Sequence, residues 1–166
     1  MPVTIRPAAV DDLPRLTEIY NHYVINGHVT FDLDPVTLEE RREWFAQFAV
    51  AGPHRLFVAE ENGIVLGYAG SFRFRTRCAY EGTIETTVYC APEAVGRGVG
   101  SALYAALFDS LHDEDLHVAI GAIALPNPPS IAFHERFGFV LAGVMHEVGR
   151  KFDRYWDVAW YEKRLS

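Results

Sequence analysis

The sequence is poor in cysteine and has no long apolar run. Its 166 residues include two cysteines, Cys78 and Cys90, and no C-x-x-C pair, which excludes the disulfide framework of a small secreted domain and the usual zinc sites. No apolar stretch approaches the roughly 20 residues that span a bilayer. Residues 1–6 also lack the basic and apolar regions of a signal peptide. We therefore expect a cytoplasmic protein that binds no metal and does not enter a membrane.

Positive charge is also scarce. The chain has 15 Lys and Arg against 22 Asp and Glu, a net charge of −7 with a pI near 5.4, so we expect no nucleic-acid partner. A small anionic ligand stays compatible with this balance if positive charge gathers locally. Apolar residues at 49% and charged residues at 22% are typical of a globular chain, and the length predicts one domain over residues 1–166.

Hydrophobic periodicity predicts the element order β α α β β β α β α β β. Helices are expected where apolar residues recur every three or four positions, and strands where they alternate or run without interruption. The expected helices cover residues 11–25, 38–48, 101–111 and 128–137, and the expected strands cover 3–6, 55–59, 64–74, 83–90, 116–124, 140–148 and 155–162. This order predicts an α/β fold with a mixed sheet and helices on both faces.

A glycine-bearing loop joins the strand at 83–90 to the next helix. It reads Val95-Gly96-Arg97-Gly98-Val99-Gly100 and is followed by Ser101. The first turn of a helix leaves N–H groups without partners and carries partial positive charge, and glycines let a ligand approach the backbone. A pyrophosphate therefore fits there, although a softened turn between strand and helix explains the glycines equally well. The G-x-G-x-G spacing and the missing lysine argue against a dinucleotide fingerprint and a P-loop.

The chain resembles the GNAT superfamily of N-acetyltransferases, and within it the phosphinothricin/methionine sulfoximine acetyltransferase branch. The matching stretches cover nearly the whole chain and are Glu85-Thr86-Thr87-Val88-Tyr89, Gly98-Val99-Gly100-Ser101-Ala102-Leu103-Tyr104, Leu125-Pro126-Asn127-Pro128-Pro129-Ser130, His134-Glu135-Arg136-Phe137-Gly138-Phe139 and Trp156-Asp157. The superfamily's pyrophosphate loop begins with Gln or Arg, whose place Val95 takes here. The resemblance implies a GNAT-like, mostly antiparallel central sheet, acetyl-CoA as co-substrate, a small-molecule amine acceptor and a homodimer.

The resemblance also implies where acetyl-CoA would bind. The diphosphate would lie against the loop residues, which are Val95, Gly96, Arg97, Gly98, Val99, Gly100 and Ser101. The pantetheine amides would pair with the backbone of Val88, Tyr89 and Cys90, as an added strand does, in a splay between this strand and the one at 116–124. Asn127 is expected to cap its helix and, with Ser130, to contact the CoA arm.

Two side chains are candidates for proton transfer. Glu85 is the only charged residue in its strand, and burial would raise its pKa toward that of a useful base. Alternation places it on one face with Thr87 and Tyr89; a sheet-surface glutamate paired with an arginine is the structural alternative. His134 titrates near neutrality, and the resembling branch carries histidine at this place. It could instead be a helix histidine capped by a carboxylate, and which of the two residues is base and which is acid stays open.

Arginines suggest where an acceptor would bind. Arg73, Arg75 and Arg77 alternate with other residues, so that three cations share one face if the strand continues. Such a stripe suits an anion, and it is also typical of a solvated sheet edge. The resemblance implies that Arg75, Arg77 and Tyr80 help to hold the carboxylate of an amino-acid acceptor. Glu85 and Thr87 would line the same pocket, and Phe31 would either wall it or pack in the core.

The expected activity is acetyl transfer from acetyl-CoA to the α-amine of a small amino-acid-like acceptor, of the phosphinothricin or methionine sulfoximine type. The amine would attack directly in a ternary complex. Two alternatives stay open. One is a GNAT enzyme for another amine, such as a polyamine, an antibiotic or a protein N-terminus, and the other is a CoA-binding sensor without turnover.

Overall fold

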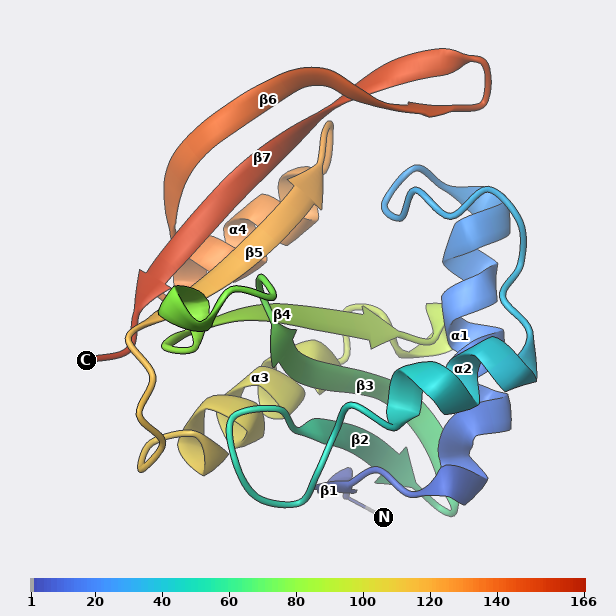
Figure 1. Ribbon diagram of the computed structural model, residues 1–166. Coiled ribbons are helices and arrows are strands. Elements are labelled where there is room, and N and C mark those ends of the chain that lie inside the picture. The colour runs from blue at the N-terminus through green and yellow to red at the C-terminus, as the bar shows by residue number, and fades with distance from the viewer. Residues whose placement is uncertain (1) are drawn as a thin grey trace.

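A seven-stranded sheet forms the centre of the molecule. The computed structural model describes residues 2–166. The strands are β1 (Thr4–Pro7), β2 (Leu56–Glu61), β3 (Ile64–Arg73), β4 (Thr83–Cys90), β5 (Val118–Ala124), β6 (Val140–Lys151) and β7 (Arg154–Arg164). They lie in the order β1-β2-β3-β4-β5-β7-β6, and every pair is antiparallel except β4 with β5 (Figure 1). The mixed, mostly antiparallel sheet predicted from the sequence is confirmed.

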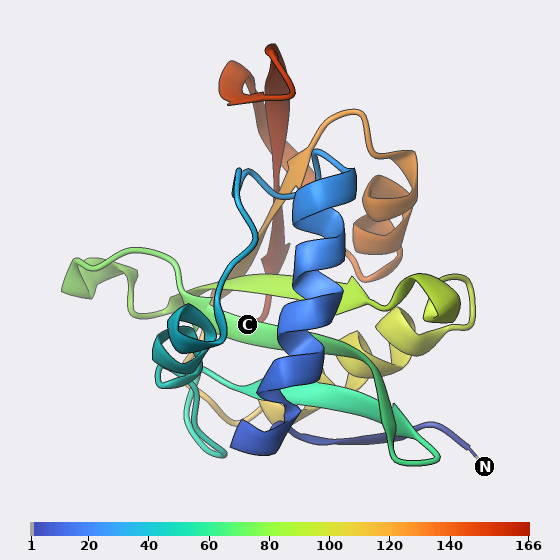
Figure 2. The ribbon, with the colours of Figure 1, turned by 90° about the vertical axis from the view of Figure 1, so that its right-hand side faces the viewer.

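Helices cover both faces of this sheet. They are α1 (Leu13–Asn26), α2 (Leu38–Phe45), α3 (Val99–Ser110) and α4 (Pro128–Arg136), with short 3-10 turns at Val10–Asp12, Cys78–Tyr80 and Pro92–Ala94. α1 and α2 lie on one face and α3 on the other (Figure 2). The Thr37 hydroxyl accepts a hydrogen bond from the Glu40 amide at 3.2 Å, and the Glu40 carboxylate accepts one from the Thr37 amide at 2.7 Å. This reciprocal cap sets the start of α2.

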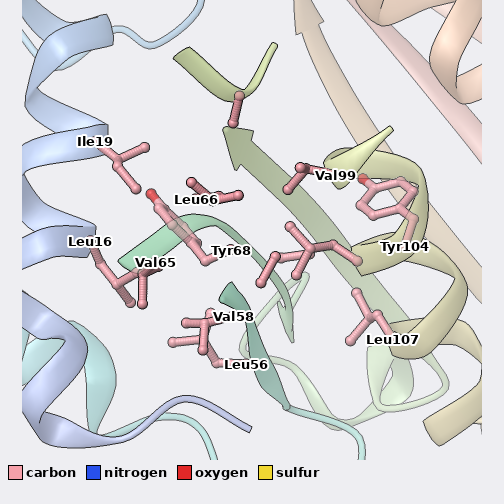
Figure 3. Packing of buried hydrophobic residues seen from close by; sticks show 14 of the residues in the cluster. Leu16, Ile19, Leu56, Val58, Val65, Leu66, Tyr68, Val99, Tyr104 and Leu107 are labelled. Carbon is pink, nitrogen blue, oxygen red and sulfur yellow. The ribbon is translucent and has the colours of Figure 1, made fainter. Parts of the chain in front are cut away.

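Two apolar layers hold the helices against the strands (Figure 3). On one side Leu16 and Ile19 of α1 pack toward β3, and on the other Val99 and Leu107 of α3 pack against the sheet; all four are buried. Burial of this kind stabilises each large aliphatic side chain by about 1.5–3 kcal/mol. Strands β2 to β4 are therefore held in place from both faces, and so are the residues on β4.

The sheet opens between β4 and β5. The two strands pair only where Thr83–Glu85 face Val118–Ile120. Beyond Glu85, β4 continues along β3 as far as the pair Cys90–Gly67, while β5 continues along β7 (Figure 1). Among the described residues, no strand pairs with the β5-facing edge of β4 beyond Glu85. The splay implied by the family resemblance is thus confirmed.

The structure corrects several expected boundaries. α2 ends at Phe45 instead of Phe48, and α3 begins at Val99, two residues before Ser101. β6 runs on to Lys151 because Phe152 and Asp153 form a tight turn, with φ of 53° and 56°. Within residues 2–166, no helix combines the length and the apolar character that a membrane crossing needs.

Candidate functional site

Two cavities meet at the gap between β4 and β5. The first, of about 360 Å³, lies beside α3 and α4 and is called here the α3–α4 cavity; its lining includes Val88, Cys90, Tyr104, Asn127, Ser130, Phe133 and His134. The second, of about 330 Å³, is called the α1–α2 cavity; its lining includes Tyr20, Asp32, Glu40, Arg41, Trp44, Tyr68, Phe72 and Glu85. Thr86, Thr87, Tyr89 and Ala122 line both. The splayed strands therefore form a passage from one side of the sheet to the other.

Glu85 lies at the point where the strands part. As alternation predicts, it lines the α1–α2 cavity together with Thr87 and Tyr89. The side chain is half-buried, and no ion pair to it forms among the described residues. Burial raises the pKa of its carboxyl above the ordinary value, and the positive charge of Arg75 opposes part of that rise. A carboxylate of raised basicity in a cavity suits a general base.

His134 is buried in the wall of the α3–α4 cavity. Its Nδ1 lies 2.8 Å from the Ser130 carbonyl, which can only accept, so Nδ1 carries the proton and Nε2 holds a lone pair. Nε2 lies 3.3 Å from the Tyr104 hydroxyl, and that hydroxyl is also 3.1 Å from Thr86 Oγ1. Burial lowers the pKa of the imidazole. His134 is thus a neutral ring that presents a proton acceptor.

Local sequence explains why the ring fits there. A β-carbon at Gly121 of β5 would stand 3.0 Å from the His134 ring, so the absence of a side chain at this position makes room for it. Asn127 caps α4 by accepting a hydrogen bond from the Ser130 amide at 3.3 Å, which confirms its expected capping role. The cap also orders the turn of α4 whose carbonyl holds His134.

The glycine loop presents free amides at the mouth of the α3–α4 cavity. Gly96 and Gly98 have φ of 80° and 79°, which strongly favours glycine. Gly98 caps α3, and the first helical bond runs from the Ala102 amide to the Gly98 carbonyl. The amides of residues 99–101 therefore have no helical partner. That of Gly100 is directed at the Cys90 sulfur, which leaves those of Val99 and Ser101 for an anion. The Arg97 guanidinium pairs with Glu61 at 2.8 Å, and Val95 is largely exposed.

The Cys90 carbonyl and thiol are both engaged within the protein. The Tyr23 hydroxyl donates to the carbonyl at 2.5 Å, which uses one of its two lone pairs. Burial raises the pKa of the thiol to about 11, so it stays protonated at neutral pH. A protonated thiol that accepts from the Gly100 amide and packs among neighbours fits a packing role for Cys90 better than a nucleophilic one.

The arginine stripe does not form. β3 ends at Arg73, so Arg75 and Arg77 lie in the following loop, exposed to solvent, and no single strand face carries all three cations. The Arg75 guanidinium lies 4.6 Å from the centre of the Phe74 ring, and the Tyr80 ring packs edge-on against Phe74 at 5.8 Å. These residues lie outside the lining of the α1–α2 cavity, although the charge of Arg75 reaches Glu85.

Phe31 does not line the α1–α2 cavity either. Its ring fills the space beside Gly149 of β6 and leaves no room for a β-carbon there. With Val29 and Trp160 it lines an adjoining apolar cavity of about 350 Å³, which shares Ala122 with the α1–α2 cavity. The structure therefore brings Glu85 and Thr87 together and places Phe31 in packing between the α1–α2 loop and the β6–β7 hairpin.

Sequence reasoning missed Arg41. This residue of α2 is 5% exposed, and its guanidinium stacks on Trp44 at 3.8 Å and on Tyr20 at 4.7 Å from the ring centres. Its Nη2 donates to the Tyr68 hydroxyl at 2.8 Å. The segment Leu38–Phe45 is so polar that its sequence indicates a helix exposed to solvent. The only sequence signal was Trp44 three positions later, which shares a helix face with Arg41.

Comparisons with known proteins agree with this geometry. The family model for the acetyltransferase (GNAT) domain matches residues 5–160. The phosphinothricin N-acetyltransferase of Streptomyces coelicolor is 54% identical, over 98% of this chain and 96% of that protein. The L-methionine sulfoximine/L-methionine sulfone acetyltransferase of Pseudomonas paraeruginosa is 37% identical, over 100% and 96%.

A solved structure is similar throughout. The phosphinothricin acetyltransferase from Sinorhizobium meliloti, crystallised in complex with acetyl-CoA, superposes with a TM-score of 0.93 at 35% identity and covers 100% of this chain and 90% of that one. The family match, the identities and the shared fold rest on nearly the full length of the chain. This chain therefore belongs to the GNAT family and is an acetyltransferase.

Proposed function

We propose that this enzyme transfers acetyl from acetyl-CoA to the α-amine of a small amino-acid-like acceptor, of the phosphinothricin or methionine sulfoximine type. The observation that carries the proposal is the passage at the β4–β5 gap, with Glu85 in one cavity and His134 in the other. Two substrates entering from opposite sides of the sheet would meet there. Such an arrangement supports direct attack in a ternary complex without a covalent acyl-enzyme.

The α3–α4 cavity fits the acetyl-CoA side. GNAT acetyltransferases bind acetyl-CoA, and the Sinorhizobium relative holds it in its crystal structure. In this chain the unpaired edge at Val88 and Tyr89 would hold the pantetheine amides, and the amides of the first turn of α3, those of Val99 and Ser101 among them, would hold the diphosphate. Asn127 and Ser130 would contact the arm between them. Bound acetyl-CoA supplies the thioester carbonyl that the amine attacks.

Glu85 is proposed as the base. An amino-acid acceptor reaches the enzyme as an ammonium ion, which must lose a proton before its nitrogen can attack. The raised pKa of the half-buried Glu85 carboxyl brings its basicity closer to that of the amine. Thr87 lies on the same strand face and, with Glu85, would line the acceptor side.

His134 is proposed to handle the proton on the thioester side. Its Nε2 lone pair lies 3.3 Å from the Tyr104 hydroxyl, which donates its own proton to Thr86 Oγ1 at the passage. His134 Nε2 would accept the proton that the attacking nitrogen loses as the amide forms. Because burial lowers the pKa of the imidazole, the resulting imidazolium would readily pass that proton to the departing thiolate. Arg75, Arg77 and Tyr80 remain proposed acceptor contacts at the outer edge of the site, near enough for Arg75 to act on Glu85 electrostatically.

The test is an acceptor screen with acetyl-CoA, followed by release of free thiol. Phosphinothricin, methionine sulfoximine and methionine sulfone are expected to be acetylated at higher kcat/KM than polyamines or a peptide with a free N-terminus. Glu85→Gln should bind CoA as the wild type does and lose about 10²-fold or more of the turnover, the typical contribution of a general base. CoA binding without thiol release for any acceptor would instead identify a sensor.

Initial-rate patterns distinguish the order of events. Direct transfer requires both substrates on the enzyme together, so double-reciprocal plots at varied acceptor should intersect. Parallel lines would indicate an acyl-enzyme intermediate and would contradict the ternary complex.

A further inference from the structure

Arg41 is a buried cation without a counter-ion. It forms no ion pair with any carboxylate among residues 2–166, its Nε has no hydrogen-bond partner, and the single hydrogen bond of its guanidinium is the one to Tyr68. The stacked rings of Trp44 and Tyr20 offset part of the cost of burying the charge. An unpaired buried guanidinium, with donors unused, is nevertheless costly to a folded protein.

This cation lines the cavity that holds Glu85. The α1–α2 cavity is lined by three carboxylates, those of Asp32, Glu40 and Glu85, and among its described lining residues Arg41 is the only cation. Two of these carboxylates, those of Asp32 and Glu40, form hydrogen bonds with groups other than Arg41. Asp32 accepts a hydrogen bond from the Tyr20 hydroxyl, and Glu40 caps α2 at Thr37. The cavity thus offers one carboxylate for an ammonium group and one guanidinium for an oxyanion.

We infer that Arg41 binds oxygen atoms of the acceptor, either those of its α-carboxylate or those at the end of its side chain, in the α1–α2 cavity. This inference rests on the proposed function, because it assumes that the acceptor enters from this side. A guanidinium is a planar fork of donors that matches carboxylate, phosphinate and sulfone oxygens. The bound group is either the acceptor's α-carboxylate or the oxygens at the far end of its side chain, which are anionic in phosphinothricin and belong to a neutral but strongly dipolar group in methionine sulfone. Glu85 would then face the amine of the acceptor, and Arg41 would face its oxygen atoms.

Calorimetric titration in the presence of CoA, which prevents turnover, tests the inference. The probes are L-methionine sulfone, its α-carboxamide and L-methionine, and the enzymes are wild type, Arg41→Gln and Arg41→Lys. Losing a charge-assisted hydrogen bond should weaken binding of methionine sulfone to Arg41→Gln by about 10- to 100-fold. Arg41→Lys keeps the charge and a donor for Tyr68 but lacks the fork, so it should lose less and stay folded.

The pattern of affinities across the three probes shows whether Arg41 holds the α-carboxylate or the side-chain oxygens. If Arg41 holds the α-carboxylate, the loss persists for L-methionine and vanishes for the carboxamide. If it holds the distal oxygens, the loss vanishes for L-methionine and persists for the carboxamide. Arg42→Gln is the matched control, because Arg42 lies next in α2, is exposed and pairs only with Glu39. It should bind all three probes as the wild type does.

A purely structural role for Arg41 predicts another pattern. Both Arg41 variants would then bind all three probes as tightly as the wild type, or more weakly by one common factor, and either result overturns the inference. Wild-type binding of the probes without their acetylation would contradict the proposed function and leave the Arg41 assignment supported. Failure of the wild type to bind any probe would contradict both.

Discussion

At the scale of single residues, burial shifts the two proposed proton carriers in opposite directions. It raises the pKa of the Glu85 carboxyl and lowers that of the His134 imidazole, since the charged form of each is disfavoured away from water. The rise makes the Glu85 carboxylate a stronger base toward an ammonium group, and the fall keeps the His134 imidazole neutral at neutral pH.

The charge of Arg75 gives a direct test of the Glu85 assignment. Arg75 lowers the pKa of Glu85 against the larger effect of burial, so Arg75→Gln should raise that pKa further. Because the base must be ionised, activity falls as pH drops through this pKa, and the acid limb of kcat/KM should move to higher pH in the variant. A pH–rate profile measures it.

Arg73→Gln is the control for that experiment. Arg73 is exposed at the end of β3, and its substitution removes the same unit of charge. Arg73 does not, however, contribute to the shift in the pKa of Glu85. Its acid limb should stay at the wild-type position. An Arg75→Gln profile that coincides with the wild type would mean that the limb belongs to a group other than Glu85.

At the scale of elements, the glycine loop combines backbone strain with open space. Among residues 2–166, apart from the two chain neighbours, no atom lies within 4 Å of a β-carbon built on Gly98, and its φ is positive. Gly98→Ala should therefore destabilise the fold by about 1 kcal/mol, lowering the melting temperature by roughly 2–4 °C. It should also raise the KM for acetyl-CoA by about tenfold, because the ligand can no longer approach the helix start as closely.

Gly63 separates the two effects. It lies in the turn between β2 and β3 with φ of 78° and equally open space, and it lines neither cavity. Gly63→Ala should show the same loss in melting temperature with an unchanged KM. An unchanged KM in Gly98→Ala as well would remove this loop from the cofactor site.

Elements whose signal is local could be predicted from the sequence. The alternation around Glu85, the capping box at Thr37 and the glycines before α3 each act through neighbours a few residues away, and the structure contains each of them. The β4–β5 splay is a different case. It depends on which strands stop pairing, and it was expected only because the chain resembles a family that has it.

Features set by distant contacts could not be predicted in this way. Arg41 is buried by Tyr20 and Tyr68, which lie on α1 and β3, and no pattern within α2 shows that. The predicted arginine stripe is wrong because β3 ends at Arg73, before the second arginine, Arg75. β6 extends beyond its expected end, to the turn at Phe152 and Asp153. These residues adopt left-handed conformations without a glycine, so the sequence lacks the usual signal for a turn.

At the scale of the whole molecule, β6 leaves an edge of the sheet open. It is the outermost strand, it is 12 residues long, and it exposes the apolar side chains of Val140, Leu141, Met145 and Val148. A long apolar edge invites pairing with another chain unless something covers it. A second copy of this chain is the simplest cover, since a two-fold interface uses the same patch on both subunits.

We therefore predict a homodimer that uses β6. Light scattering after gel filtration should give twice the 18.7 kDa of one chain. Leu141→Lys should shift the protein to monomer, because the two-fold axis brings like charges together where apolar side chains met. Leu33→Lys makes the same exchange at an exposed leucine in the α1–α2 loop, outside β6, and should stay dimeric. A wild type that is monomeric at micromolar concentration, or two variants that dissociate alike, would exclude β6 as the interface.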